Sequence, residues 1–328
     1  MNARPKAIVI AVCAVGVCTL VLGGNLNPPP GPVAPTMKAL DVVEPRTLVQ
    51  SLSGSATALY VINSPGAYYL TGDVVGVNGK HGIEIAASGV TLDLNGFDLL
   101  GVAGSLDGVS TTVGGLTSIA VVNGSVRNWG DEGVDLATSA AINCRVADLL
   151  ASGNAGNGMF VGAGSTVSNC SVSSNTVTGI STNDGSTVSN CSAFSNTGIG
   201  ISTSGGTVAD CTARQNTLDG IVCFSQCVIR GNTCSSNGSG AGSGAGIHAT
   251  NSDNRIESNN CTGSDRGIDV DAAGNFITRN ICSGNTTNWD VVAGNVCLVV
   301  QGVTGAAILG NTGGVAPGST DPNANFTY

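Results

Sequence analysis

The chain has 328 residues and a formal net charge of −9, yet only 10% of its residues are charged. It contains 49 glycines and is 41% hydrophobic, with only 4% aromatic residues. This composition excludes coiled coils, helical bundles, simple disorder and the basic surface of a nucleic-acid-binding protein. A large all-β protein with many tight turns remains.

The N-terminal segment predicts export. Arg4 and Lys6 precede an apolar run at 7–22, and Gly23-Gly24 follows it, which is the pattern of a signal peptide at 1–24. The run is shorter than the about 20 residues of a membrane-spanning helix, so a retained anchor is the less favoured alternative. We expect a secreted, periplasmic or cell-surface protein whose mature chain does not span the membrane. Without Arg4 and Lys6 the net charge changes from −9 to −11.

A proline-rich linker at 25–40 is predicted to separate the leader from the fold, because its prolines favour an extended spacer. Residues 41–80 are predicted to form strands that cap the N-terminal end of the fold, since an open sheet end invites pairing with other chains. The last segment, 301–328, is predicted to be a C-terminal cap or tail that folds over the final turn.

An internal repeat occupies the region 81–300. An apolar residue preceded by glycine recurs there about every 20 to 26 residues, a period typical of one turn of a β-solenoid. These first anchors are Ile83, Val109, Val134, Met159, Ile180, Ile201, Ile221, Ile247 and Ile268, with Val291 taken as the tenth. A second column contains Val167, Val188, Val208, Ile229, Ile256 and Ile277. The repeat predicts a parallel β-helix of about ten turns.

Two short segments resemble a known superfamily. Residues 89–97, Gly-Val-Thr-Leu-Asp-Leu-Asn-Gly-Phe, and residues 64–73 are similar to the opening turn of right-handed parallel β-helix proteins of the pectate-lyase-like superfamily. The resemblance covers about residues 45–315 and implies a right-handed solenoid. It does not imply one activity, because the superfamily includes lyases, hydrolases, epimerases, adhesins and inert modules.

Ten cysteines follow the leader and fall mostly into two columns of the repeat. Cys170, Cys191 and Cys211 share one column, which Cys144 would join, and Cys234, Cys261 and Cys282 share the other. Successive turns lie about 4.8 Å apart, whereas bridged Cβ atoms are about 3.8 Å apart. We therefore expect buried thiols with at most one or two bridges. Cys223 and Cys227 are the best candidate pair, and a zinc site is not expected.

The first candidate site uses the outward residue after each first anchor. This column places His248 beside Asp269 on neighbouring turns, with Asp271 on the same face and Arg266 in the preceding turn. In proteins of the superfamily that it resembles, this face is where the sugar cleft runs. His248, Arg266, Asp269 and Asp271 are thus the candidate catalytic residues. The simpler interpretation, a solvated polar face with an ion pair, is favoured.

The second candidate site is the segment 127–135. Arg127, Trp129 and Asp135 are the candidate substrate-binding residues, because tryptophan stacks on sugar rings. Asp131 and Glu132 are candidate ligands for Ca²⁺, the one cofactor considered. The simpler interpretation, a turn decorated with polar residues, is again favoured. Trp289 is expected in a comparable turn, where it would cap the end of the core.

Two functions remain open. The favoured one is an exported, non-catalytic and monomeric module that contacts polysaccharide or another envelope component through one long face. The alternative is a lyase or hydrolase that acts on acidic glycans. Charge discriminates between them, because a polyuronate on a protein of net charge −11 needs a basic strip or bound Ca²⁺. An ice- or mineral-binding face is a weaker third hypothesis, since it requires a regular threonine array.

Overall fold

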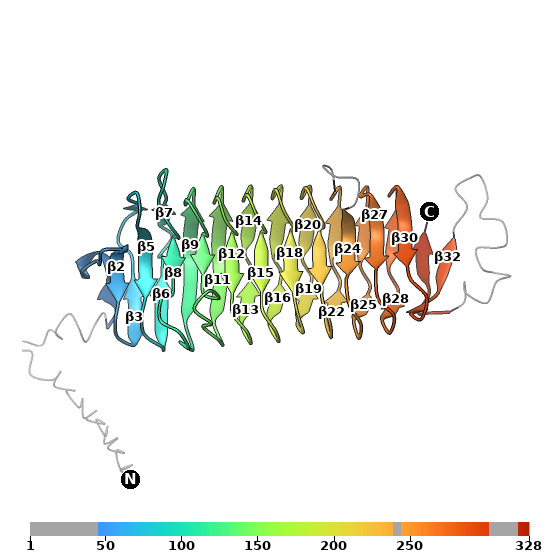
Figure 1. The fold of residues 1–328 in the computed structure, drawn as a ribbon, viewed down its shortest axis with the longest axis horizontal. Helices are drawn as coiled ribbons and strands as arrows, with labels where there is room; N and C mark the ends of the chain where they lie inside the picture. The colour runs from blue at the N-terminus through green and yellow to red at the C-terminus, as the bar shows by residue number, and fades with distance from the viewer. Residues whose placement is uncertain (1–44, 239–243, 302–320, 328) are drawn as a thin grey trace, which may run out of the picture. The chain divides into compact units, whose positions relative to one another are not determined.

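The computed structural model describes residues 45–238, 244–301 and 321–327, so the predicted signal peptide and proline-rich linker lie outside the described residues. From Arg46 onward the chain forms one unit, in which short strands wind repeatedly around a common axis (Figure 1). Every pairing between its named strands that the structure records is parallel. The predicted all-β parallel β-helix is confirmed, with about 12 turns rather than ten.

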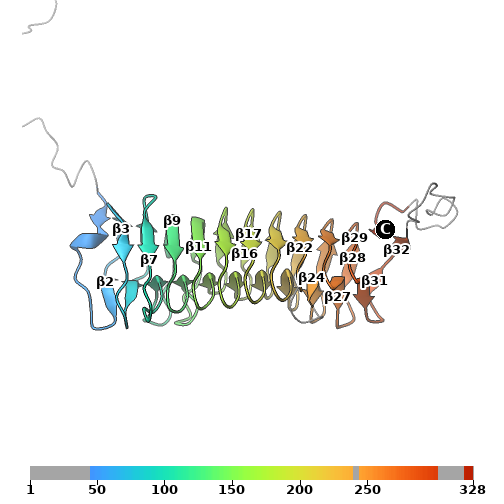
Figure 2. The same ribbon diagram turned by 90° about the horizontal axis from the view of Figure 1, so that it is seen from above.

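One side of the solenoid is a sheet of eleven strands that contains the first anchors. Each strand pairs with the equivalent strand of the next turn, so the strands stack along the axis (Figure 2). The anchors pair in register and therefore form a continuous row. Its strands are β2 (Ala58–Ile62), β5 (His81–Ile85), β8 (Val109–Ser110), β10 (Val134–Asp135), β12 (Met159–Val161), β15 (Ile180–Thr182), β18 (Ile201–Thr203), β21 (Ile221–Cys223), β24 (Ala245–Ala249), β27 (Arg266–Val270) and β30 (Thr287–Val291).

The remaining strands form a bent sheet of 22 strands that closes the solenoid. At its N-terminal end are β1 (Thr47–Leu48), β3 (Gly66–Tyr69), β4 (Val74–Val75), β6 (Val90–Asp93), β7 (Asp98–Leu100), β9 (Ala120–Arg127) and β11 (Arg145–Ser152), and the short helix η1 (Val49–Ser51) follows β1. Then come β13 (Thr166–Ser168), β14 (Ser171–Ser173), β16 (Thr187–Ser189), β17 (Ser192–Phe194), β19 (Thr207–Ala209), β20 (Thr212–Arg214), β22 (Val228–Arg230), β23 (Thr233–Ser235), β25 (Arg255–Glu257), β26 (Asn260–Thr262), β28 (Phe276–Thr278), β29 (Ile281–Ser283), β31 (Val296–Cys297), β32 (Val299–Gln301) and β33 (Asn325–Thr327).

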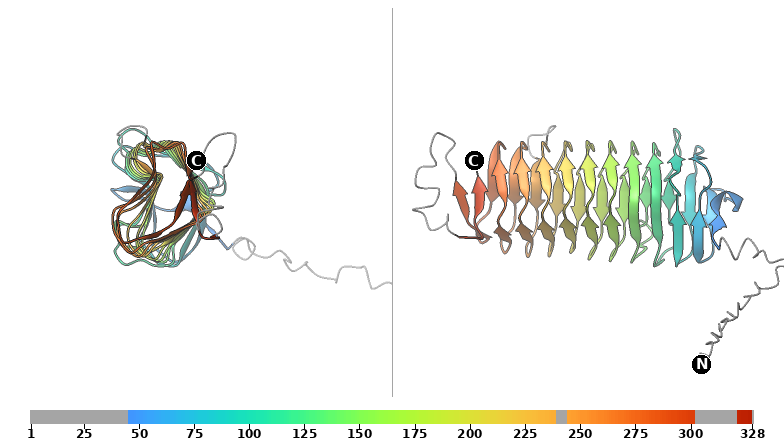
Figure 3. Two further views of the ribbon diagram at one scale, coloured as in Figure 1. Left: turned by 90° about the vertical axis from the view of Figure 1, so that its right-hand side faces the viewer. Right: turned by 180° about the vertical axis from the view of Figure 1, so that it is seen from behind.

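The core lies between the two sheets, and both predicted columns line it. The second anchors pair in register, as in Val167 with Val188, and are fully buried. Viewed along the axis, the turns superimpose around this core (Figure 3). Burying these rows against one another is what a single turn cannot do alone, so the turns stabilise one another.

Stacked asparagines join the turns at the bends. Asn154, Asn175, Asn196 and Asn216 are buried, and each side-chain oxygen accepts the backbone N–H of the preceding turn at 3.0–3.1 Å. Glycine precedes the anchors for a steric reason. A Cβ at Gly133 would lie 2.5 Å from the carbonyl oxygen of Gly158 and 2.7 Å from Asn154 Nδ2. These interlocking rows satisfy buried backbone groups that a bend would otherwise leave unpaired.

Three predictions about register need correction. β2 pairs with β5, so the sheet begins one strand before Ile83. Trp289, rather than Val291, pairs with Ile268, so Trp289 occupies the anchor column inside β30 and not a turn. Cys144 aligns with Ser165, because its neighbour Arg145 pairs with Thr166, and it does not join the Cys170 column. In each case the strand pairing gives a register that differs from the one expected from the spacing of the Gly-apolar dipeptides.

The C-terminal strand β33 inserts beside β29 and β32. Asn325 continues a row of asparagines there, and its side-chain oxygen accepts the backbone N–H of Asn280 at 2.9 Å. Residues 302–320 of the last segment lie outside the described residues, so its role as a C-terminal cap or tail stays a prediction. No helix in the described part of the chain is long and apolar enough to cross a membrane.

Candidate functional site

The outer face of the eleven-stranded sheet bears the predicted polar column. Its register is confirmed pair by pair, from Glu84 beside Ser110 to His248 beside Asp269. The column gathers charge at its two ends, whereas Phe160, Ser181, Ser202 and Val222 lie between them. Two groups of residues therefore need separate description.

The His248 cluster contains Asp219, His248, Arg266, Asp269, Asp271 and Asp290. His248 Nε2 lies 3.0 Å from Asp271 Oδ2, and its Nδ1 lies 3.3 Å from Asp219 Oδ2. The hydrogen bond to Asp219, with that to Asp271, raises the pKa of His248 to about 9 despite its burial. The imidazole is thus a cation at neutral pH that joins the turn of Asp219, its own turn and the turn of Asp271.

Arg266 supplies the second cation of this cluster. Its Nη1 lies 2.8 Å from Asp269 Oδ2, and its Nε lies 3.0 Å from Asp290 Oδ2. Burial raises the pKa of Asp269, while His248 and Arg266 act in the opposite direction. The four candidate catalytic residues therefore do come together. Asp219 and Asp290 were missed, although Asp219 precedes Ile221 by the same two positions that separate Arg266 from Ile268.

The His81 cluster lies near the N-terminal end of the same face and contains His81, Asp107, Asp131 and Glu132. His81, Asp107 and Glu132 each lie two residues before a first anchor, so consecutive turns bring them together. His81 Nδ1 is 3.1 Å from Asp107 Oδ2, which raises the pKa of His81. One oxygen from each of Asp107, Asp131 and Glu132 lies within 4.8 Å of the others.

Glu132 is the most perturbed acid of this cluster. Burial first, then its hydrogen bond with Asp131 and the nearby carboxylates, raise the pKa of Glu132 to about 7. Its Oε1 accepts a hydrogen bond from Asn157 Nδ2 at 3.0 Å. The cluster lines a groove of about 400 Å³ together with Ser110, Thr112, Asp135, Thr138 and Ser139. An acid whose pKa is raised to about 7 in a groove can donate a proton near neutral pH.

The segment 127–135 does not form one site. Trp129 is only 1% exposed, and its indole Nε1 donates a hydrogen bond to the carbonyl of Leu99 at 3.0 Å, so the prediction that it stacks on a sugar is wrong. Its backbone N–H bonds Asn154 Oδ1 at 3.0 Å, which puts Trp129 at the N-terminal end of the asparagine row.

Arg127 and Asp135 lie on different sheets. Arg127 ends β9 in the bent sheet, where its Nε donates to Asp98 Oδ2 at 3.0 Å. Asp135 is buried in β10, and its Oδ1 accepts the backbone N–H groups of Ala137 and Thr138 at 2.9 Å. Asp135 thus lines the groove, whereas Arg127 does not contribute to it.

The predicted calcium ligands Asp131 and Glu132 lie together, and Asp107 adds a third carboxylate. This oxygen donor set suits Ca²⁺. His81 and Asn157 already engage Asp107 and Glu132, so a cation would share these carboxylates with existing partners. Calcium binding stays a prediction.

The outward column also contains an aromatic residue that was not predicted to bind a ligand. Phe160 lies in β12 between Asp135 and Ser181 and is half-buried, so one part of its ring is open to solvent. An aromatic ring on a polar face is the kind of group that contacts the apolar side of a sugar. Its outward position was readable from the repeat.

Comparisons with known proteins agree on the fold. A family model described as a right handed beta helix region matches residues 106–243. The mannuronan C-5 epimerase AlgE4 A-module of Azotobacter vinelandii is 14% identical with a TM-score of 0.58, over 76% of this chain and 87% of that chain. The enzymatically active domain of tailspike protein 2 of bacteriophage CBA120 is 13% identical with a TM-score of 0.51, over 73% and 43%.

Pectate lyase Pel9A is 17% identical with a TM-score of 0.42, over 76% of this chain and 75% of that chain. No curated protein matches the sequence. This chain is a right-handed parallel β-helix protein. The right-handed parallel β-helix that the sequence resemblance implied is therefore confirmed as the fold. Identities this low establish the fold and leave the chemistry to the site itself.

Proposed function

We propose that this chain is an exported, non-catalytic β-helix module that binds polysaccharide along the outer face of its eleven-stranded sheet. The observation that carries the proposal is the in-register row Phe160, Ser181 and Ser202 between the two charged clusters. From the turn of Glu132 to that of Asp219 are four steps of about 4.8 Å, or about 19 Å. A half-buried aromatic ring followed by hydroxyl groups suits a short run of sugar units.

The charge of this face supports a neutral polysaccharide as the ligand. Within the two clusters and their row, carboxylates exceed the cations His81, His248 and Arg266. The carboxylates are Glu84, Asp107, Asp131, Glu132, Asp135, Asp219, Asp269, Asp271 and Asp290. A polyuronate would meet like charges unless Ca²⁺ at Asp131 and Glu132 offset them. Neutral chains avoid that repulsion.

A binding experiment with the full chain tests the proposal. In affinity electrophoresis through gels that contain neutral or polyuronate polysaccharides, we expect retardation by a neutral polymer. Phe160→Ala should weaken binding at least fivefold. Phe194→Ala is the matched control, because Phe194 is a phenylalanine that is exposed on β17 of the bent sheet, away from the proposed binding face. Equal losses in both variants, or binding to polyuronate alone without Ca²⁺, would contradict the proposal.

The groove beside His81 favours a second function, glycoside hydrolysis. Glu132 would donate its proton to the leaving oxygen, and Asp107 or Asp131 would accept a proton from the water that attacks the sugar. The specific support is the raised pKa of Glu132 in a groove that other carboxylates share. The full chain would then release reducing ends from a polysaccharide, with activity that falls above about pH 7 and disappears in Glu132→Gln.

A lyase is the less supported alternative. Beta-elimination on a polyuronate requires a cation that stabilises charge at the uronate carboxyl and a base that removes the adjacent proton. We expect no ultraviolet absorbance of unsaturated uronate from pectate, alginate or polygalacturonate, with or without Ca²⁺. Product formation that Asp269→Ala abolishes would instead place catalysis in the His248 cluster and overturn the non-catalytic proposal.

A further inference from the structure

Three cysteine thiols stack on consecutive turns of the bent sheet. Cys170, Cys191 and Cys211 precede strands β14, β17 and β20, whose first residues pair in register. Each Sγ lies 3.2 Å from the carbonyl oxygen two residues before it. The three side chains thus share one conformation, so neighbouring sulfur atoms are separated by about the 4.8 Å that separates the turns.

This separation has opposite consequences for two kinds of bond. A disulfide needs sulfur atoms about 2.05 Å apart, so the fold keeps these thiols unbridged, and all three are free. A zinc–thiolate bond is about 2.3 Å long, and a cation with bonds of similar length that lies midway between two sulfurs spans about 4.6 Å. The spacing therefore fits two-coordinate binding of a soft cation, which prefers thiolate ligands.

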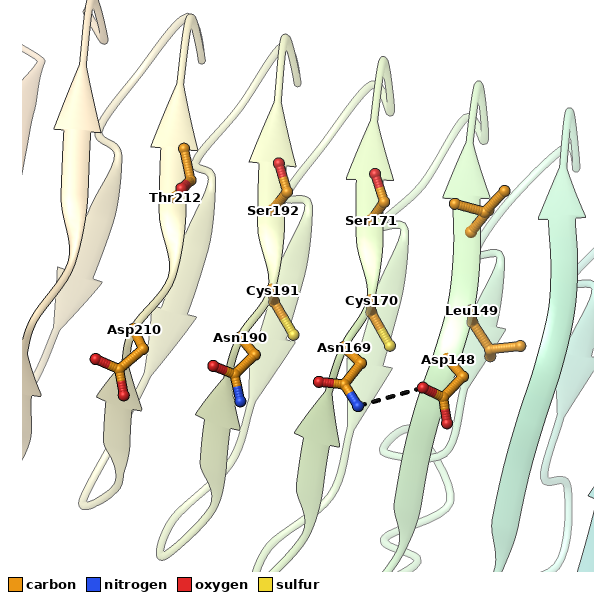
Figure 4. Close-up of a pocket in the computed structure, with 11 residues that line it drawn as sticks. Asp148, Leu149, Asn169, Cys170, Ser171, Asn190, Cys191, Ser192, Asp210 and Thr212 are labelled. Atoms are coloured by element: carbon orange, nitrogen blue, oxygen red, sulfur yellow. Dashed lines mark hydrogen bonds between the residues drawn. The ribbon is translucent and has the colours of Figure 1, made fainter.

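A groove gives access to this row (Figure 4). It has a volume of about 560 Å³, and Cys170 and Cys191 form part of its lining between the amides of Asn169 and Asn190 and the hydroxyls of Ser171 and Ser192. Asp148 and Asp210 line it toward its two ends, where their carboxylates favour the approach of a cation. The sulfur atoms are thus covered but lie next to solvent-accessible space.

Cys191 is the middle thiol of the three, with Cys170 on the preceding turn and Cys211 on the following turn. A thiolate is the form of cysteine that binds metal. Either neighbour of Cys191 can therefore supply the second sulfur.

We propose that the groove binds one thiophilic monovalent cation, Cu⁺ or Ag⁺, between the sulfur of Cys191 and that of Cys170 or Cys211. Binding replaces the two thiol protons, which pass to solvent, with two metal–sulfur bonds. The resulting bis-thiolate complex carries one negative charge, and no oxidation occurs. This site is independent of the polysaccharide face, because it lies on the bent sheet.

Other cysteines provide internal controls. Cys227 has a similar thiol conformation, with its Sγ 3.3 Å from the carbonyl of Ser225, but its column neighbours are Gly206 and Asn254. The column of Cys227 thus offers no second sulfur on an adjacent turn. Cys234, Cys261 and Cys282 form a second stack, yet they are fully buried in the core. We expect that stack to exchange cations far more slowly than the groove.

The test uses the reduced full chain in a Cys261→Ser background, which interrupts the core stack. Cu⁺ is supplied from a chromophoric Cu⁺ chelator, and the competition gives stoichiometry and affinity. We expect one tightly held ion per chain. Cys191→Asn should weaken binding at least 100-fold, because it leaves Cys170 and Cys211 two turns apart, while Asn continues the column as Asn232 does. Cys211→Asn and Cys227→Ser should each retain the ion.

X-ray absorption at the copper edge adds a direct readout, for which we expect two sulfur neighbours and no nitrogen. Circular dichroism establishes that Cys191→Asn folds, and Cys191→Ser repeats the loss with a smaller substitution. Undiminished binding in both Cys191 variants would overturn the proposal. So would equal losses in Cys227→Ser, oxygen or nitrogen coordination, or a disulfide between any two of the three stacked cysteines.

Discussion

The two histidine clusters occupy the same face of the same sheet, yet their charges are balanced differently. In the His248 cluster every carboxylate lies within ion-pair distance of His248 or Arg266. In the His81 cluster, among the residues that the structure describes, only Asp107 has such a partner. The first cluster consequently holds a protonated histidine and the second a carboxylic acid that keeps its proton to about pH 7.

The difference between the two clusters arises from their side chains and not from the backbone of the solenoid. The backbone register is the same at both clusters, so position alone makes neither cluster catalytic. The number of cations in one outward column decides whether the carboxylates brace neighbouring turns or crowd one another. We call the His248 cluster a brace, because its ion pairs join neighbouring turns of the solenoid. The crowded carboxylates of the His81 cluster are instead typical of a binding or catalytic site.

The largest effect should come from the tryptophan beneath the His81 cluster. Trp129 is fully buried, and its ring would lie within 3.0 Å of a Cβ at Gly82. Trp129→Ala should lower the free energy of unfolding by about 4 kcal/mol, through a cavity and the unpaired carbonyl of Leu99. Trp289→Ala, at the half-buried edge strand β30 beyond the His248 cluster, should cost about 1–2 kcal/mol. Denaturant unfolding measures both.

If Trp129→Ala were as mild as Trp289→Ala, Trp129 would not be a core residue and its exclusion from sugar binding would fail. Trp129→Phe is the control for volume. It retains most of the ring but not the hydrogen bond to Leu99, so its loss should be about 1–2 kcal/mol.

The sequence predicted the columns well because a period fixes which residues become neighbours. His248 beside Asp269 follows from counting positions after Ile247 and Ile268, and strand pairing adds only the direction of stacking. The same counting would have found Asp219, and it would have joined His81 to Asp107 and Glu132. His81, Asp107 and Asp219 were not predicted as site residues, because they lie two positions before an anchor whereas the predicted column lies one position after it.

Residues in the bends were not predictable in the same way. Arg127, Trp129 and Asp135 are near in sequence, but the chain crosses from the bent sheet to the eleven-stranded sheet between them. Trp129 turns inward because its position, four residues before Gly133, is the one that Asn154 holds before Gly158. An isolated tryptophan in a polar segment carries no sign of that direction. The inward direction of the Trp129 side chain becomes clear only from its place in the row of stacked asparagines.

A smaller effect distinguishes the clusters directly. Asp269→Asn should destabilise the protein by about 2 kcal/mol, because it weakens the bond to Arg266 and leaves that cation and His248 with less compensation. Glu132→Gln should instead raise the free energy of unfolding at neutral pH, because the raised pKa of Glu132 means that ionisation of its carboxyl group destabilises the fold there. Shifts in denaturation midpoint give both values. The brace assignment is wrong if the two variants behave alike.

The smallest and most specific effect lies in the pH dependence of stability. The pKa of His248 is raised from 6.5 to about 9, so its contribution is complete below about pH 6.5 and is lost as the pH rises through about 9. The pKa of Glu132 is raised from 4.5 to about 7, so the folded state binds more protons in that interval and stability falls as the pH rises through it. The two clusters therefore titrate in largely separate windows.

Single substitutions should remove one window each. Glu132→Gln should flatten the decline between about pH 4.5 and 7 and leave the decline above it, while His248→Gln should do the reverse. Comparison of each variant with the unsubstituted protein cancels the shared contributions of His81 and Asp269, whose pKa values are also raised. Parallel profiles would mean that Asp219, Asp269 and Asp271 do not hold the imidazole proton. The difference in charge balance between the two clusters would then have no effect on the free energy of unfolding.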